Sequence, residues 1–244
     1  MHLIIDIGNS SAKVALFEDN TPVKEIRTEH EELPTLLVTL SEEQRITRAI
    51  VSSVIPIDET TEQAINKLPF PVLHMSAKLR MPFSIAYKTP ETLGADRLAA
   101  VAEARMQYPK SDLLVIDVGT AITYDIVTSE GVYLGGNISP GIGMRFKALH
   151  HFTGKLPLVD KEGKRVRIGD TTENAIREGV LQGVSYEIEG YIDTYRNKYP
   201  HLLVFLTGGG ANFLDNRTKS RTFADSLLVL KGLNRILTLN DENF

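Results

Sequence analysis

The sequence predicts an α/β fold built from two similar halves. The first half opens with LIIDIGNSSAKVALF, residues 3–17, in which two apolar segments flank an Asp-x-Gly-x-Ser turn. The run LLVIDVGTAITYDIVT, residues 113–128, repeats this arrangement with Asp-x-Gly-Thr. An apolar segment that leads through such a turn into a second segment rich in β-branched residues is typical of a β-hairpin. One such hairpin in each half indicates a duplicated domain.

Each hairpin turn carries the groups that a phosphate site needs. A glycine lets the backbone approach a phosphate, N–H groups can point at its oxygens, and the acid can hold a cation. The alternative is an ordinary β-turn, because Asp and Gly are also common turn residues. The repetition favours a nucleotide phosphate held between the halves. A third segment agrees with it, because the apolar run 203–206 ends in Thr207 and three glycines.

Composition excludes several classes of function. A chain of 244 residues with 42% hydrophobic side chains is long enough for two modest domains. Its net charge of −4 gives no basic surface for nucleic acid or anionic membranes. The absence of cysteine excludes disulfides, thiolate metal sites and cysteine nucleophiles. The first strand begins too early for a signal peptide, and no apolar run approaches the ~20 residues of a membrane span, so a cytoplasmic protein is expected.

Strands are expected to alternate with helices along the chain, as in α/β proteins. Strands are predicted at 23–27, 48–54, 72–75 and 132–139, with an extended segment at 83–87. Helices are predicted at 33–44, 60–68, 95–106, 142–151 and 172–199. The last helix has an apolar stripe that forms either core or a dimer surface. The stripe comprises Ala175, Ile176, Val180, Val184 and Ile188.

Three short segments offer polar groups with two interpretations each. Ser52 and Ser53 stand where a strand ends, so they either touch substrate or pack. Thr172 begins a helix, where its hydroxyl either caps the backbone or reaches a ligand. Asp96 and Arg97 also follow a helix start, where an acid can simply satisfy N–H groups. As functional groups, the acid can accept the proton of a substrate hydroxyl, and the guanidinium offers a planar fork to a carboxylate.

Six motifs follow one another along nearly the whole chain. They are DIGNS with Lys13, LGADR (93–97), DVGTAIT (117–123), GGNISPG (135–141), TGKLP (153–157) and TGGGA (207–211). In this order they resemble the type III pantothenate kinases, within the superfamily of acetate kinase, sugar kinases, heat-shock chaperone ATPases and actin. The sequence departs from the family at Ser10, where threonine is usual, at Gly154, where alanine is common, and at Thr171, where asparagine is usual.

The resemblance implies duplicated ribonuclease H-like domains, also called actin-like ATPase domains, with a cleft between them. We place these domains at residues 1–106 and 107–244, the second with a dimerisation helix. The implied reaction is the ATP-dependent phosphorylation of pantothenate to 4′-phosphopantothenate, the first step of coenzyme A biosynthesis. The family's partners and cofactors would be a second copy of the chain, Mg²⁺, and K⁺ or NH₄⁺. For the apolar stripe, the resemblance favours the dimer surface.

The resemblance also assigns roles to residues. Asp96 would be the general base. The ATP site would comprise Asp6, Gly8, Asn9, Ser10 and Lys13 as the first phosphate loop, with Thr120 on phosphate and Gly208 and Gly209 beside the adenosine. The metals would be held by Asp6, which binds Mg²⁺, and Asp117, which binds the monovalent cation. The pantothenate pocket would be lined by Tyr87, Gly94, Ala95, Asp96 and Arg97, and completed by Thr172 of the partner subunit.

Three alternatives stay open. Another small-molecule kinase of the superfamily would share Asp6 and Asp117 but lack LGADR. A non-catalytic regulator with this fold would be expected to have lost Asp96 or Asp117, and both are present. A filament-forming actin-like protein would be longer.

Overall fold

The computed structural model describes residues 1–164, 166–211 and 222–241, which divide into two compact units. Unit 1 comprises residues 1–109, the short segment 131–133 and the chain from Leu227 onward. Unit 2 comprises residues 110–130 and 134–226. The expected second domain, residues 107–244, therefore does not coincide with unit 2, since the end of the chain belongs to unit 1.

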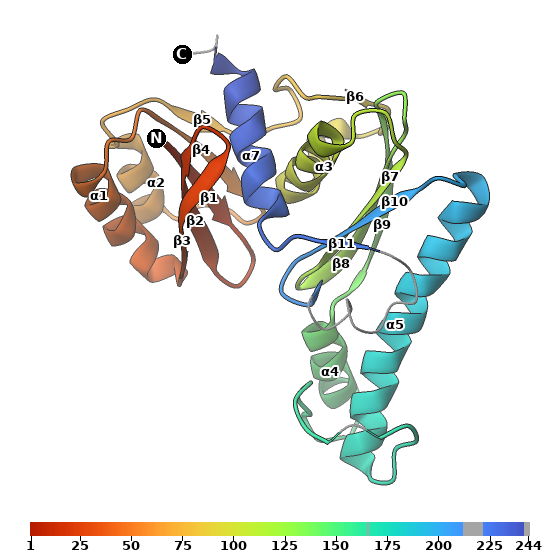
Figure 1. The fold of residues 1–244 in the computed structure, drawn as a ribbon. Helices are drawn as coiled ribbons and strands as arrows, with labels where there is room; N and C mark the ends of the chain where they lie inside the picture. The colour runs from red at the N-terminus through yellow and green to blue at the C-terminus, as the bar shows by residue number, and fades with distance from the viewer. Residues whose placement is uncertain (165, 212–221, 242–244) are drawn as a thin grey trace. The chain divides into compact units, whose positions relative to one another are not determined.

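Unit 1 is built on a five-stranded sheet with the order β3-β2-β1-β4-β5 (Figure 1). Its strands are β1 (His2–Ile7), β2 (Ala12–Glu18), β3 (Thr21–Thr28), β4 (Arg48–Ser53) and β5 (Val72–His74). The first three form an antiparallel meander, whereas β4 pairs parallel with β1 and β5 pairs parallel with β4. The predicted strands 23–27, 48–54 and 72–75 are thus confirmed.

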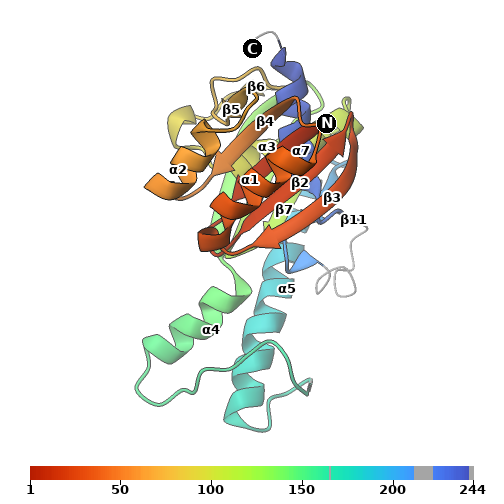
Figure 2. The ribbon, with the colours of Figure 1, turned by 90° about the vertical axis from the view of Figure 1, so that its left-hand side faces the viewer.

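Helices cover both faces of this sheet. They are α1 (Leu33–Glu43), α2 (Glu59–Asn66), α3 (Ala95–Gln107) and α7 (Leu228–Leu239), with short 3-10 turns η1 (His30–Glu32) and η2 (Pro90–Thr92). In Figure 2, α1 lies in front of the sheet, and Figure 1 shows α3 and α7 on the opposite side from α1 and α2. Leu3, Ile5 and Ile7 share a buried cluster with Leu37 of α1. Because side chains alternate along a strand, Asp6 faces the other way.

The last helix joins unit 1 because it packs closely on α3. A Cβ atom on Gly232 of α7 would overlap the carbonyl oxygen of Ala99, so the two backbones touch at this glycine. Arg235 donates to Glu103 over 3.0 Å beside this contact. At the sheet, Oδ1 of Asn234 on α7 accepts a hydrogen bond from Nδ1 of His2 over 2.8 Å. These side chains are far apart in sequence, which is why the domain boundary was predicted differently.

Unit 2 repeats the topology of unit 1. Its sheet has the order β11-β10-β7-β8-β9-β6. The strands are β7 (Leu113–Val118), β8 (Ala121–Val127), β9 (Val132–Pro140), β10 (Leu203–Thr207) and β11 (Phe223–Ala224). The short β6 (Ser84–Ile85) pairs in parallel with Val132 and Tyr133, the first residues of β9, which belong to unit 1 as β6 does. As in unit 1, a hairpin comes first, and two later strands add in parallel beside its first strand. The predicted duplication is therefore confirmed.

The long helix α5 (Thr172–Lys198) forms the core of unit 2 with the sheet and with α4 (Ile142–His151). Four of the five residues of its apolar stripe, Ile176, Val180, Val184 and Ile188, are buried within their own chain. The assignment of this stripe to a dimer surface is therefore wrong. The helix lies on a sheet whose inward side chains need a cover, and a stripe on one helix cannot serve both surfaces.

No helix in the described part of the chain combines the length and the apolar character that crossing a membrane requires.

Candidate active site

The first predicted turn, between β1 and β2, is held by its own backbone and by two side chains. The N–H of Gly8 donates to the carbonyl of Ser11 over 3.1 Å, and Asn9 and Ser10 are exposed at the tip. Arg27 donates to the Ser11 hydroxyl over 2.9 Å. On the other side, Nε2 of His30 lies 3.0 Å from the carbonyl oxygen of Gly8. The turn therefore presents a small polar tip on a fixed base.

Asp6 is buried at the base of this turn. Its neighbours in strand register are Lys13 on β2 and Ser52 on β4. Among the described residues, neither Oδ1 of Asp6 nor the Ser52 hydroxyl has a hydrogen-bond partner. Ser53, in contrast, donates to the carbonyl of Ile55 over 2.6 Å, which is a local turn contact. Of the two serines, Ser52 thus belongs with the site.

The surroundings of Asp6 oppose its negative charge. Burial raises its pKa to about 6, and the charge of Asp96 adds to this, while Lys13 and the nearby Ser52 hydroxyl act in the other direction. Both carboxylates belong to unit 1, and the negative charge of Asp96 disfavours the charged form of Asp6. A buried acid with a perturbed pKa beside a second acid is typical of a functional site.

The LGADR segment places Asp96 in the first turn of α3. Its Oδ1 accepts the N–H of Arg97 over 2.9 Å. A Cβ atom on Gly94 would lie 2.5 Å from that same oxygen, so only glycine leaves room for this carboxylate. Arg97 itself is 7% exposed, and Ala95 is half-buried. The helix start thus orients the acid through one backbone N–H.

Tyr87, the other predicted pocket residue, lies after β6. Its ring is half-buried, with its centroid 6.5 Å from that of the fully buried Tyr133. Phe83 packs on the same tyrosine at 5.8 Å. An aromatic cluster therefore fixes the segment that carries Tyr87 within unit 1.

In unit 2, Asp117 is the last residue but one of β7 and lies against the TGGGA turn. A Cβ atom on Gly208 would overlap Oδ1 of Asp117, and this glycine also has a φ of 85° that favours glycine. The N–H of Gly210 donates to the carbonyl of Val118 over 2.9 Å. In the hairpin turn itself, the N–H of Gly119 donates to Ala121 over 3.0 Å. The structure therefore brings Asp117 and the TGGGA turn together, with Gly209 open to the surroundings.

The start of α4 also lies on the second hairpin turn. The N–H of Gly141 donates to the carbonyl of Thr120 over 3.0 Å. A Cβ atom on Gly141 would overlap the carbonyl oxygens of both Gly119 and Thr120. The GGNISPG motif therefore packs against the DVGTAIT motif, which explains why a glycine closes it.

Comparison with known proteins identifies the family that has these motifs. The profile of "Type III pantothenate kinase" matches residues 2–194. A type III pantothenate kinase from Bacteroides fragilis is 52% identical over 241 residues, which is 99% of each chain. One from Porphyromonas gingivalis is 46% identical and covers 98% of each chain. The chain belongs to the type III pantothenate kinase family. The predicted resemblance and the kinase class are thus confirmed.

Solved structures agree on the fold of this family member. A conserved Campylobacter jejuni protein assigned to the Baf family of transcriptional activators aligns with a TM-score of 0.66 at 24% identity, covering 98% of this chain and 99% of the other. An inorganic polyphosphate/ATP-glucomannokinase from Arthrobacter aligns with a TM-score of 0.52 at 14% identity, covering 99% and 100%. At these identities the likeness concerns the fold alone, which is the predicted actin-like kinase fold.

The helix α5 begins at Thr172, as predicted, and a neighbouring residue provides its cap. The capping residue is Thr171, whose hydroxyl oxygen accepts the N–H of Asn174 over 3.2 Å. Thr172 is the first helical residue and is exposed. The position at which this chain departs from its family therefore carries the cap, and the hydroxyl of Thr172 has no capping role.

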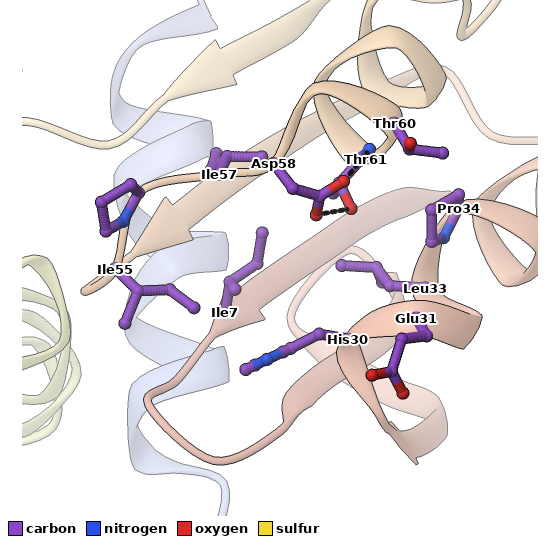
Figure 3. Close-up of a pocket in the computed structure, with 11 residues that line it drawn as sticks. Ile7, His30, Glu31, Leu33, Pro34, Ile55, Ile57, Asp58, Thr60 and Thr61 are labelled. Atoms are coloured by element: carbon purple, nitrogen blue, oxygen red, sulfur yellow. Dashed lines mark hydrogen bonds between the residues drawn. The ribbon is translucent and has the colours of Figure 1, made fainter.

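Unit 1 contains a pocket of about 460 Å³ beside the first turn (Figure 3). It lies between η1 and the segment that follows β4, and Ile7 and Ile55 point into it together with His30. The carboxylate of Asp58, at its edge, already accepts two hydrogen bonds from Thr61. The residues that line it are not those predicted to bind ATP or pantothenate. Its link to the predicted site is His30, a residue that no sequence pattern indicated.

The cost of burying Asp6 predicts that its removal stabilises the fold. Its pKa is about 6 in the folded chain against an ordinary value of 3.8, so ionising it costs stability as the pH rises from about 4 to 6. We expect Asp6→Asn to raise the free energy of unfolding at pH 7 by up to about 3 kcal/mol. At pH 4 the gain should vanish. Urea unfolding at the two pH values measures both.

Asp58→Asn provides the control, because hydrogen bonds from Thr61 lower the pKa of Asp58. This variant should lose stability at pH 7 rather than gain it. An Asp6→Asn protein no more stable than the natural chain at pH 7 would contradict the assigned burial of a charged Asp6.

Proposed function

We propose that this protein transfers the γ-phosphoryl group of ATP to the terminal hydroxyl of pantothenate, giving 4′-phosphopantothenate and ADP. The observation that carries the proposal is the near full-length relationship to type III pantothenate kinases, 52% identical over 99% of each chain. The buried Asp6, the half-buried Asp96 and Asp117, and the glycine turns support it, because they occupy the motifs by which the family was predicted. The product would enter coenzyme A biosynthesis, and a cytoplasmic location stays a prediction.

In this proposal Asp96 takes the proton of the attacking hydroxyl. The hydroxyl oxygen forms a bond to the γ-phosphorus, the bond from that phosphorus to the β–γ bridging oxygen breaks, and the electron pair leaves with ADP. The helix start orients Asp96 through the N–H of Arg97, and a carboxylate held in this way can accept the proton. Arg97, Gly94, Ala95 and Tyr87 would line the pantothenate pocket, with the guanidinium of Arg97 facing the carboxylate.

The two phosphate turns would bind ATP. Gly8, Asn9 and Ser10 offer a polar tip, with Lys13 as the nearby cation, and Thr120 offers a hydroxyl on the second turn. Gly208 and Gly209 would border the adenosine, since Gly209 has open space at its Cα. Phosphoryl transfer needs positioning and charge neutralisation more than covalent chemistry, and backbone turns provide both.

The donor atoms fit the metals of the family. No group of three or more acidic or histidine side chains suits a metal within the described ranges. Mg²⁺ commonly takes one or two carboxylates and completes its shell with phosphate and water, and the buried, unpartnered Oδ1 of Asp6 fits that pattern. Bound there, Mg²⁺ would neutralise charge on the phosphate oxygens. Asp117, beside the Val118 carbonyl, offers oxygen donors to K⁺ or NH₄⁺.

We also propose a homodimer, on a different surface from the one first predicted. Unit 2 exposes several large apolar side chains, a pattern typical of an interaction surface. They are Leu134, Ile138, Met144, Phe152, Ile168 and Tyr186. Since the stripe of α5 is occupied by its own core, these side chains offer the apolar area that a second copy would cover. Thr172, exposed at the start of α5, would then contribute to the partner's pantothenate pocket.

The first prediction from this proposal concerns Asp96. Asp96→Asn should lower kcat with pantothenate by about 10²-fold or more, because the amide cannot accept the proton, while pantothenate binding stays nearly unchanged. A coupled ADP-release assay measures kcat, and calorimetry measures binding. Glu91→Gln, an exposed acid just before the motif, should keep full activity. Turnover by Asp96→Asn close to the natural rate would leave Asp96 as a helix-start residue alone.

The second prediction concerns Asp117. Asp117→Asn should lower turnover and blunt its dependence on K⁺ or NH₄⁺, because the anionic ligand that attracts the cation is lost. The measurement is kcat across a K⁺ titration at constant ionic strength, with Na⁺ as the balance. Glu130→Gln, an exposed acid of the same unit, should keep the natural K⁺ response. Equal activity of the natural protein in Na⁺ alone and in K⁺ would contradict the cation site.

The third prediction tests whether Thr172 acts across a dimer. Thr172→Ala should raise KM for pantothenate through the loss of a hydrogen bond, whereas Thr171→Ala should only lower stability, by about 1 kcal/mol. A heterodimer of one Thr172→Ala chain and one Asp96→Asn chain should then contain one site with natural KM. The reason is that the intact Asp96 of one chain meets the intact Thr172 of the other.

The reverse heterodimer is the control for that assignment. It pairs a chain carrying both substitutions with a natural chain. If Thr172 acts across the dimer, each site of this heterodimer lacks either Asp96 or Thr172. A natural KM from this heterodimer, or a monomeric mass for the active protein, would overturn the proposed dimer.

A further inference from the structure

Glu187 of α5 joins three other elements of unit 2. Its Oε1 accepts hydrogen bonds from the hydroxyls of Tyr124 on β8, over 2.7 Å, and Ser139 on β9, over 2.5 Å. Its Oε2 accepts the guanidinium of Arg145 on α4 over 2.5 Å. Both oxygens are thus engaged, and one carboxylate links a helix to two strands and to a second helix.

The network is partly buried and electrostatically matched. The side chains of Glu187 and Arg145 are 24% and 21% exposed. Burial would raise the pKa of Glu187, but the hydrogen bonds from Ser139, Arg145 and Tyr124 outweigh it and hold the pKa below its ordinary value. Tyr124 has its pKa raised by burial and then by its bond to Glu187, so it stays a neutral donor. The carboxylate is therefore charged and its donors are fixed.

Arg145 carries this link to the turn between β9 and α4. Its Nε donates to the carbonyl of Pro140 over 2.7 Å while its Nη2 binds Glu187. The two bonds use two edges of one planar guanidinium, which lysine cannot reproduce. They tie the last residues of β9 to α5, which lies beside α4 in both views of the fold (Figures 1 and 2).

The residue that follows Pro140 is Gly141, which rests on the second phosphate turn. Its N–H bonds the carbonyl of Thr120, and its Cα leaves no room for a side chain against Gly119 and Thr120. A shift of the β9–α4 turn would therefore be transmitted to the backbone of this phosphate turn. The contacts run from Glu187 to Arg145, then to Pro140 and Gly141, and end at Thr120.

We propose that Arg145 and Glu187 are positioning residues for ATP binding, acting through Gly141 on the Gly119–Thr120 turn. The inference rests on the proposed function, which gives that turn its role on phosphate. Neither side chain touches ATP in this account. Their task is to hold the turn where its hydroxyl and backbone meet the phosphates, and a displacement of a fraction of an ångström is enough to weaken such contacts.

The test compares Arg145→Met, Glu187→Gln and the double variant. Each single change removes the ion pair while keeping side-chain volume, so a roughly tenfold rise in KM and Kd for ATP is expected. KM for pantothenate should stay within about twofold, since that pocket is proposed elsewhere. The double variant should bind ATP no more weakly than the single variant of lower ATP affinity, because both substitutions remove the same ion pair. Arg145→Lys should rescue only part of the affinity.

Lys147→Met is the matched control, because Lys147 lies exposed on the same helix. It should leave the affinity for ATP unchanged. The measurements are the ATP Kd by calorimetry with Mg²⁺ and K⁺ present, both KM values, and the thermal midpoint. Variants with a lower midpoint but natural ATP affinity would make the pair merely structural and overturn the inference. Equal losses for ATP and pantothenate would do the same.

Measurements of ATP binding and pantothenate phosphorylation by the natural protein distinguish a failure of this inference from a failure of the proposed function. If it binds ATP but does not phosphorylate pantothenate, the proposed function fails, and the ATP affinities of the variants still decide the inference. If it phosphorylates pantothenate and Arg145→Met keeps natural ATP affinity, the inference alone fails. A natural protein that does not bind ATP overturns both.

Discussion

A buried carboxylate, one oxygen of which has no hydrogen-bond partner among the described residues, is the constraint on which unit 1 depends. Asp6 is placed by strand alternation on the side of the sheet away from Leu3 and Ile5, where Ser52 is its neighbour in register. A neutral side chain at this position would give the folded chain a higher stability, because burial and the charge of Asp96 both raise the pKa of Asp6. An arrangement that costs stability at neutral pH persists when a ligand uses the charge. The surrounding turn supports this interpretation, since Arg27 contacts the Ser11 hydroxyl and His30 the Gly8 carbonyl of the turn.

In unit 2, backbone contacts rather than a buried charge shape the candidate phosphate site. Gly208 and Gly141 each stand where a Cβ atom would overlap the turn that carries Asp117 or Thr120. Three segments distant in sequence thus come close enough for their backbones to touch, so their N–H and carbonyl groups shape the site together with the Asp117 carboxylate. Backbone dipoles fixed in this way need no rearrangement when a phosphate binds. The glycines are therefore required by close approach, and at Gly208 by a positive φ as well.

Local patterns predicted most of what lies within one hairpin or one helix start. The acids at the ends of β1 and β7, the glycine turns and the helix that begins at Ala95 follow from neighbouring residues. What could not be predicted depends on contacts across the chain. The end of the chain joins unit 1 because Gly232 fits against Ala99, and the stripe of α5 is core because a sheet lies under it. His30 and Glu187 carry no local signal, since their partners lie far away in sequence. The role of Arg145 depends on Glu187, which lies 42 residues away.

The network around Glu187 is difficult to explain by stability alone. An ion pair that is largely removed from water is often no more stabilising than apolar side chains of the same volume, and breaking one partner is costly. The network also borders the apolar core of unit 2. Tyr124 is fully buried, and its ring stacks on that of Tyr191 with the two centroids 3.9 Å apart. Charged hydrogen bonds have directions that apolar contacts lack, so they fix the angle of α4 and of the turn before it. The angle of α4 decides whether Gly141 contacts Thr120. The hydrogen bonds of Glu187 set this angle from α5, although Glu187 lies 42 residues away from Arg145 along the chain.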